Sequence, residues 1–449
     1  MITKDNRVCI THLYLALTAL FLLFPRAARA QADQTERSVE VGFEQRVRNE
    51  NWNNILDYSD KTDDQRNQIR YRTRLWSSIH PLPKIDINVG LDQETNEIII
   101  PKTPFKFDEI IFESLNVEFH DILTKGLSFK VGRQNLMKDD GWIFIEGNPW
   151  DGSRAVYSNA FDLNYAWGKS KFEAIGVWNP AHDRFLPRIH NVNRQLVEWD
   201  EQAIGGIFSH SPRKDTDLEA YYFLKKEYHD RRPPSNPQFQ PDRHVNTAGG
   251  RLVRRFHGDW TWIAEGDEQW GEGHGGVDIC GWGAYSNLRK KLKTPGQPYI
   301  QGGWYGFSGD NPSTQSTNEG WDPLFSRWPA WSELYIYSQF KEKGVAYWTN
   351  LSMWQAETGF SPWKKANWRF TYYRMDAFQR FAGSQAIFGP GTGRGNMFQS
   401  RLDFTLSPQL RGHALYEVML PGSYYRVGDP GYFLRFEMIY ALKHKFGRV

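Results

Sequence analysis

The chain has 449 residues, with 55 Lys and Arg against 52 Asp and Glu, so its formal net charge is +3. The first thirty residues hold four basic side chains and one acidic side chain, so they carry this whole excess and the rest of the chain is neutral. A neutral chain lacks the basic surplus of a nucleic-acid-binding protein. The two cysteines, Cys9 and Cys280, exclude a fold stapled by several disulfides.

The N-terminus is typical of a secretory signal. Lys4 and Arg7 precede an apolar run over residues 13–24, and Ala28-Arg29-Ala30 offers the small residues of a cleavage site. The apolar run is shorter than the roughly 20 residues that a membrane helix needs. We therefore expect residues 1–30 to be a signal peptide that is removed, and residues 31–449 to form a single exported domain.

Hydropathy that alternates with a period of two dominates the rest of the chain and predicts strands, because successive side chains of a strand point to opposite faces. In residues 68–76, apolar and aromatic side chains alternate with Arg70, Arg72 and Arg74. Three arginines on one strand face repel one another unless that face meets water or anions. A soluble sandwich could also place the arginines outside, but the pattern favours a barrel with the arginines inside.

Eighteen segments fit this strand pattern. The mean hydropathy is −0.64, yet 15% of the residues are aromatic. A polar average with many rings favours a barrel that hides polar residues inside and carries aromatic girdles at the membrane interfaces. We predict an all-β fold, a transmembrane antiparallel β-barrel of about 18 strands around a water-filled lumen. The predicted strands are 39–48, 67–78, 84–94, 109–121, 126–136, 153–168, 170–179, 200–211, 216–228, 243–257, 259–269, 277–289, 298–308, 344–358, 366–379, 396–407, 409–419 and 430–446.

Long connections alternate with short ones, as in barrels that have tight turns on the periplasmic side and loops outside. Residues 49–66, 180–199 and 229–242 are polar and are predicted to be external loops. The longest connection, 309–343, is predicted to fold into the lumen or to cover it. Within it, residues 328–340 fit either a short helix or an extra strand.

The chain resembles the alginate-export family of outer-membrane porins. Three segments carry the resemblance, LSFKVGRQNLMKDDGW (127–142), GSRAVYSNAFDLNY (152–165) and SGDNPSTQSTNEGWDPLFSRW (308–328), and the likeness extends from about residue 38 to the end. It implies an eighteen-stranded barrel in the bacterial outer membrane whose electropositive pore exports a polyuronate, with arginines that bind carboxylates and acids that sort the polymer. The chain departs from the usual aromatic C-terminus, because Phe446 is followed by Gly447-Arg448-Val449.

Strand parity predicts which charged side chains enter the lumen. Guanidinium groups suit a chain of carboxylates because their planar fork can make two hydrogen bonds to each. Arg133 shares the parity of Val131, toward lipid, so we predict a bulge at Gly132 that turns it inward. The alternative is that each cation only pairs with an inward acid, for which Asp86 and Glu118 are also available. The predicted lumenal residues are Arg46, Arg70, Arg72, Arg74, Lys130, Arg133, Arg154, Arg369, Arg401 and Arg435, with Asp162, Glu265, Asp403 and Glu437.

The tryptophans are predicted to play two roles. Trp167, Trp260, Trp262 and Trp368 fall on the outward stripe of their strands and are expected to form a membrane-interface belt. Others lie in connections, where they can touch a sugar, namely Trp142, Trp150 and Trp321.

Enzyme signatures are missing from the sequence, which contains no GxSxG or HExxH motif and only scattered histidines. We therefore predict no catalytic residues, no metal and no cofactor. The expected partners are an anionic polysaccharide or another acidic solute, outer-membrane lipid and periplasmic export components, with no nucleic acid. Two alternatives remain open: an anion-selective diffusion porin for small acids, and a secreted β-rich enzyme that acts on acidic polysaccharide. A monomer is the favoured state.

Overall fold

The computed structural model describes residues 37–145, 157–192, 197, 199–229, 242–326, 331–340, 342, 348–381, 383 and 386–447. The predicted signal peptide, Arg154 and Trp150 lie outside the described residues. Among the described residues, no helix is long and apolar enough to cross a membrane.

All eighteen predicted strands are present, and a two-residue strand, β14, is added to them. A seven-residue helix and a single 3-10 turn complete the regular structure of the described part. The elements are β1 (Ser38–Asn53), β2 (Arg66–Leu82), β3 (Ile85–Ile100), β4 (Ile110–Phe119), β5 (Leu127–Gln134), β6 (Ser158–Trp167), β7 (Ser170–Asn179), β8 (Asp200–Arg213), β9 (Thr216–Tyr228), β10 (Arg243–Phe256), β11 (Trp260–Glu272), η1 (His274–Gly276), β12 (Asp278–Lys291), β13 (Tyr299–Phe307), β14 (Thr317–Asn318), α2 (Leu334–Phe340), β15 (Leu351–Phe360), β16 (Ala366–Asp376), β17 (Gly393–Thr405), β18 (Leu410–Pro421) and β19 (Gly431–Phe446).

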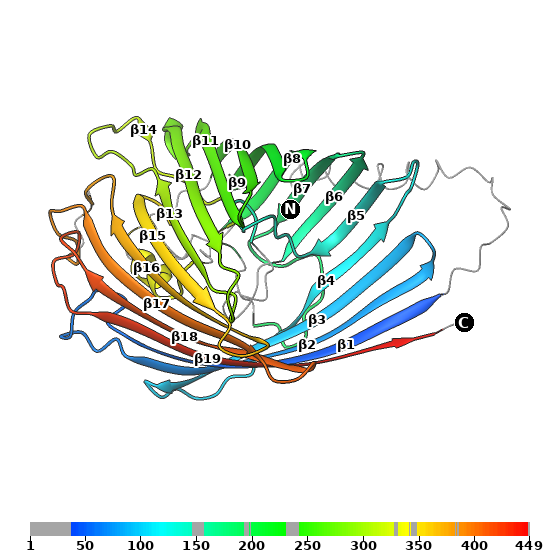
Figure 1. Cartoon of the computed structure of the whole chain (residues 1–449), viewed down its shortest axis with the longest axis horizontal. Coiled ribbons are helices and arrows are strands. Elements are labelled where there is room, and N and C mark those ends of the chain that lie inside the picture. The colour runs from blue at the N-terminus through cyan, green and yellow to red at the C-terminus, as the bar shows by residue number, and fades with distance from the viewer. Residues whose placement is uncertain are drawn as a thin grey trace.

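The sheet closes on itself. Each long strand pairs antiparallel with its neighbours in the chain, and β13 pairs directly with β15. The first and last strands also pair, from Val39 opposite Phe446 to Asn53 opposite Tyr432, so that β19 lies beside β1 (Figure 1). β14 pairs in parallel with the start of β12 and stands outside this circuit. The predicted barrel of eighteen strands is therefore confirmed, and it has no open edge.

The alternation of side chains along the strands separates an inner face from an outer face. On β2, Arg70 and Arg72 are buried inside whereas Leu75 is 53% exposed on the outside. On β9, Tyr221 and Phe223 are buried whereas Tyr222 is exposed. The inner face carries most of the charged groups and the outer face is apolar and aromatic, which is the pattern of a barrel in lipid.

The two ends of the barrel differ in their connections. Short turns, such as 168–169 between β6 and β7 and 214–215 between β8 and β9, gather at the end where β1 starts and β19 finishes. The long connections gather at the opposite end. We call the first end the short-turn end, which in outer-membrane barrels faces the periplasm.

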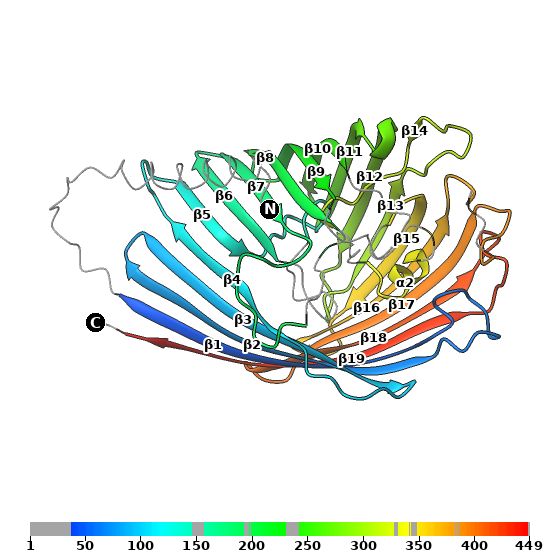
Figure 2. The same ribbon diagram turned by 180° about the vertical axis from the view of Figure 1, so that it is seen from behind.

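Two of the long connections fold into the lumen. One follows β5 and includes residues 135–145, and the other joins β13 to β15 and carries α2. They meet at a parallel bridge between Phe144 and Phe325, where the N–H of Ile145 donates to the carbonyl of Phe325 and the N–H of Phe325 donates to the carbonyl of Ile143. α2 lies inside the ring of strands (Figure 2). The inward fold of this connection is as predicted, and residues 334–340 take the helical alternative.

Candidate functional site

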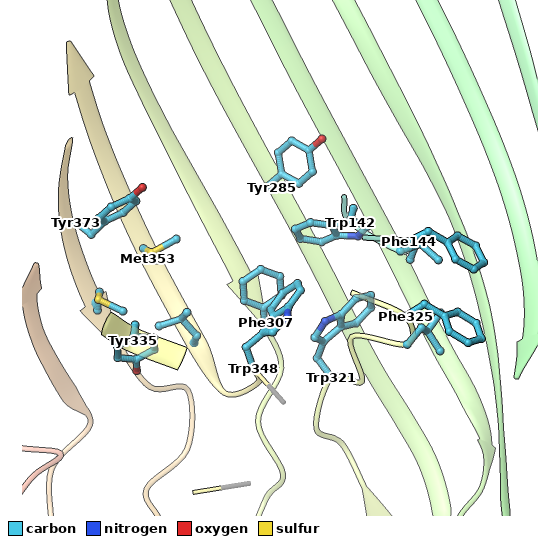
Figure 3. Packing of buried hydrophobic residues seen from close by; sticks show 14 of the residues in the cluster. Trp142, Phe144, Tyr285, Phe307, Trp321, Phe325, Tyr335, Trp348, Met353 and Tyr373 are labelled. Carbon is cyan, nitrogen blue, oxygen red and sulfur yellow. The ribbon is translucent and has the colours of Figure 1, made fainter. Parts of the chain in front are cut away.

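An aromatic cluster, which we call the lumen plug, fills part of the barrel interior. Its members are Trp142, Phe144, Trp321, Phe325 and Trp348, and they pack on Phe307 of β13 (Figure 3). The rings of Phe144 and Phe325 stack with their centroids 4.9 Å apart, and Phe307 meets Trp348 edge-on at 4.3 Å. All six are buried. Trp142 and Trp321, which were predicted to reach a solute, thus form part of a packed core inside the lumen.

Charged side chains of the wall hold the plug in place. The Lys225 ammonium lies 2.9 Å from the carbonyl of Leu324 and 4.6 Å from the ring of Phe325. Arg243 forms an ion pair with Asp322, and the Gln269 side chain donates to the carbonyl of Asp322 at 2.8 Å and accepts from its N–H at 2.8 Å. The residues Trp321 to Phe325, part of the third resemblance segment, therefore build the base of the plug.

A cavity of about 460 Å³ lies between the plug and one side of the wall. It extends from the plug toward the short-turn end, because its lining along β12 runs from Tyr285 to Lys291, the last residue of that strand, and its lining along β13 runs from Phe307 back to Gln301. Its charged and aromatic boundary includes Asp140, Trp142, Tyr285, Arg289, Lys291, Tyr305, Trp331, Glu333, Trp348, Glu357, Arg369, Tyr373, Arg401 and Glu417.

Two of the predicted arginines meet on this cavity. Arg369 of β16 and Arg401 of β17 lie directly opposite each other across the strand pair. Like charges in that position repel. Both are bound to one carboxylate, Asp403, at 3.5 Å and 2.9 Å, and their side chains remain 35% and 28% exposed. Two guanidinium groups therefore share one negative charge, and a net positive charge faces the cavity.

Sequence reasoning missed two further cations, Arg289 and Lys291 of β12. The Arg289 guanidinium lies 3.5 Å from Glu357 and 4.5 Å over the ring of Tyr299. Strand parity contained the signal for Arg289, because it shares a face with Tyr285, which packs against Trp142 of the plug. Lys291 lies beyond the strand end that the sequence predicted.

The acids around the cavity are arranged differently from the cations. On the wall, Glu357 and Glu417 are buried: Glu357 accepts from Tyr299 and Thr371, and Glu417 accepts from the backbone N–H of Leu334 at 2.6 Å. The acids with more exposed side chains, Asp140 and Glu333, come from the inward connections. The cations of the cavity thus all lie on strands, and its more exposed acids both lie on the inward connections, which produces an electric field across it.

Most of the other predicted arginines belong to a buried ion-pair network on β1, β2, β3 and β19. Arg46 binds Glu94 at 2.8 Å, Arg72 binds Glu44 at 2.9 Å, and Arg70 binds Glu50 at 3.1 Å. Glu437, predicted as a lumenal acid, lies 2.6 Å from Arg48. The network comprises Arg46, Arg48, Arg70, Arg72, Arg435, Glu44, Glu50, Glu94 and Glu437, all buried. Their side chains stiffen the wall as cross-strand ladders, and direct contact with a solute stays a prediction.

The remaining predicted cations that the structure describes also have carboxylate partners. Arg74 binds Glu113 and Lys130 lies 3.5 Å from Glu118. Arg133 makes two hydrogen bonds, of 2.6 and 2.8 Å, to Asp183 of the β7–β8 connection. The predicted bulge at Gly132 is wrong, because the pairings with β4 and β6 run through Gly132 in continuous register. Gly132 instead has φ of 123°, and a Cβ there would meet the carbonyl oxygen of Leu115 at 2.3 Å.

The predicted acids Asp162 and Glu265 are also engaged with protein groups. Asp162 is 3.2 Å from Lys138, and Glu265 accepts from Tyr221 at 2.6 Å and from Tyr285 at 2.9 Å. Among the described residues, no three His, Cys, Asp or Glu side chains gather in a way that suits a metal ion.

A closed barrel with an apolar outside and a charged inside defines the class of outer-membrane porin-like channels, and solved structures agree with this. Pseudomonas aeruginosa OpdK has a TM-score of 0.59 at 11% identity, covering 90% of this chain and 99% of its own. Pseudomonas aeruginosa OccK2 (OpdF), solved with glucuronate, has a TM-score of 0.59 at 10% identity, covering 90% of this chain and 98% of its own. Acinetobacter baumannii OccAB4 has a TM-score of 0.58 at 11% identity, covering 92% of this chain and 100% of its own.

The family follows from the sequence comparison. The alginate export family matches residues 37–432, and the chain belongs to that family. No curated protein matches the chain significantly. The protein is therefore a channel of the bacterial outer membrane, as the resemblance implied.

Proposed function

We propose that this channel passes an acidic sugar polymer, a polyuronate such as alginate, along the basic side of the lumenal cavity. The observation that carries the proposal is the opposed pair Arg369 and Arg401, which shares the single carboxylate of Asp403. A uronate carboxylate would supply the missing negative charge. Arg289 and Lys291, on the same side of the cavity, would bind the next carboxylates along a chain.

The partial exposure of these cations fits weak binding during transport better than tight binding of a solute. A channel needs weak and repeated binding, because a site that holds a polymer tightly stops its flow. Arg369 and Arg401 already have one partner, so a carboxylate from a solute competes with Asp403 and is released again. Family membership and the OccK2 (OpdF) structure with glucuronate also support an acidic sugar as the solute.

The test is conductance in a planar lipid bilayer. We expect an anion-selective channel whose current is blocked transiently by alginate oligomers added on the short-turn side, and less by neutral dextran of the same length. Raising the salt concentration should weaken the block, because screening acts over about 8 Å at physiological ionic strength. Cation selectivity, or equal block by dextran, would contradict the proposal.

A second candidate is a diffusion porin for small acids. The size of the cavity favours it, because about 460 Å³ beside a packed plug holds a small acid without any movement of the protein. Such a porin would let free glucuronate through in a liposome-swelling assay, and alginate oligomers would not alter its current. The two assays together separate the two functions.

A further inference from the structure

One arginine of the buried network has a partner that does not come from the barrel wall. Arg435 of β19 donates from Nε to Glu50 of β1 at 2.9 Å, and from Nη1 to Glu333 at 2.6 Å. Glu333 belongs to the inward connection, directly before α2. Among the described carboxylates that bind arginines of the network, the others lie on strands.

Glu333 also stands at the boundary between this network and the cavity. Its side chain is 26% exposed, whereas that of Arg435 is 3% exposed, and Glu333 lines the cavity together with Arg401. The carboxylate of Glu333 therefore covers the cavity side of Arg435. If it moved away, Nη1 of Arg435 would face the same space as the Arg369 and Arg401 pair.

We propose that Glu333 is a built-in competitor that occupies Arg435 in place of a solute carboxylate. The inference rests on the proposed function and names the ligand that function prefers: an acid with several linked carboxylates. Exchange of one carboxylate for another keeps the buried Arg435 paired, and an unpaired buried charge is the costly state. The displaced Glu333 carboxylate stays on the cavity, where its side chain is already 26% exposed. The exchange is therefore favourable whenever the local concentration of carboxylate is high.

Linked carboxylates provide that concentration. A uronate unit bound at Arg369 and Arg401 holds the neighbouring units of its chain close to Glu333, at an effective concentration in the millimolar range for short flexible links. A single acid has no such advantage, so Glu333 excludes it from Arg435. The competitor thus selects polymer over monomer within one cavity.

The movement required is small, because the segment around Glu333 has other anchors. The backbone N–H groups of Glu333 and Leu334 donate to Glu417 at 3.0 and 2.6 Å. Farther along, Glu342 makes two hydrogen bonds of 2.8 Å to Arg394 of β17. A swing of the Glu333 side chain alone uncovers Arg435, and the helix keeps its place.

The experiment compares single-channel block by alginate hexamers and by free glucuronate in the wild type, Glu333→Gln and Glu272→Gln. Glu272 has the same chemistry but is exposed at the end of β11, so it serves as the matched control. We expect Glu333→Gln to lower the half-blocking concentration of the hexamer about tenfold, because a solute carboxylate no longer has to displace the Glu333 carboxylate from Arg435. The value for glucuronate should change less than twofold, and Glu272→Gln should match the wild type.

Glu333→Asp keeps the charge and should return the hexamer value to within about twofold of the wild type. If hexamers block the wild type but Glu333→Gln leaves their half-blocking concentration unchanged, the competitor role is overturned while the proposed function stands. If hexamers block neither protein, the proposed function itself fails. Folding of each variant is verified by heat-modifiable gel mobility, because a closed barrel keeps its compact shape in detergent until it is boiled.

Discussion

Replacing Arg46 and, separately, Arg401 by Gln should separate the two kinds of lumenal arginine. Arg46 lies in the buried network, where it is 1% exposed and binds Glu94 at 2.8 Å. Arg401 faces the cavity and binds Asp403 at 2.9 Å. We expect Arg46→Gln to reduce the stability of the barrel with little effect on ion selectivity. We expect Arg401→Gln to change the ion selectivity with little effect on stability.

The magnitudes follow from burial. Removal of one partner from a buried ion pair costs about 3–5 kcal/mol of unfolding free energy, whereas a partly exposed pair contributes about 0.2–1 kcal/mol. A unit charge about 8 Å from a passing ion in water changes the energy of that ion by roughly 0.5 kcal/mol, with opposite signs for anions and cations. Loss of Arg401 should therefore change the anion-to-cation permeability ratio by about two- to fivefold, less at high salt.

Two measurements check this pair of variants. Urea unfolding of the detergent-folded barrel gives the free energy of unfolding, and the reversal potential across a salt gradient gives the permeability ratio. The reasoning is refuted if Arg46→Gln shifts the reversal potential as much as Arg401→Gln does. It is also refuted if both variants lose the same unfolding free energy.

Three further predictions concern other parts of the lumen. Asp403→Asn should raise anion preference in the reversal-potential assay, because Arg369 and Arg401 then share no carboxylate. Phe325→Ala should cost about 3–5 kcal/mol of unfolding free energy and speed amide exchange in residues 138–145, because loss of the ring leaves a cavity in the plug. Burial raises the pKa of Asp183, but hydrogen bonds from Arg133 and from backbone N–H groups outweigh burial and hold the pKa below its usual value. This clamp is therefore fully present at neutral pH and is lost as the pH falls below about 4, which limited proteolysis of residues 180–192 should detect.

The strands could be predicted because their cause is local. The period of two along β7 and β9 predicts residues 170–179 and 216–228, which are the observed bounds. The position where β5 ends does not depend on local sequence alone. Its predicted strand runs to residue 136, but β5 ends at Gln134 because the following residues leave the wall to bond with Phe325, far away in the sequence.

The candidate site was predictable only in part for the same reason. Parity places Arg72 and Arg401 on the same inner face, yet one is buried in a network and the other faces a cavity. The difference depends on which acids oppose them on neighbouring strands and on where the connections fold. Neither fact is contained in the period of the strand itself.

The distribution of contacts also determines which part of the lumen can yield to a polymer. The wall is paired by backbone hydrogen bonds all round, and its network arginines are bound to acids on adjacent or next-but-one strands. The plug is held by aromatic stacking and by backbone bonds to Phe325, so its displacement would expose a large apolar area. The Glu333 contact with Arg435 is different, because a solute carboxylate can replace it like for like. A pore that must remain closed to most solutes and open to a polyanion is therefore expected to change first at Glu333.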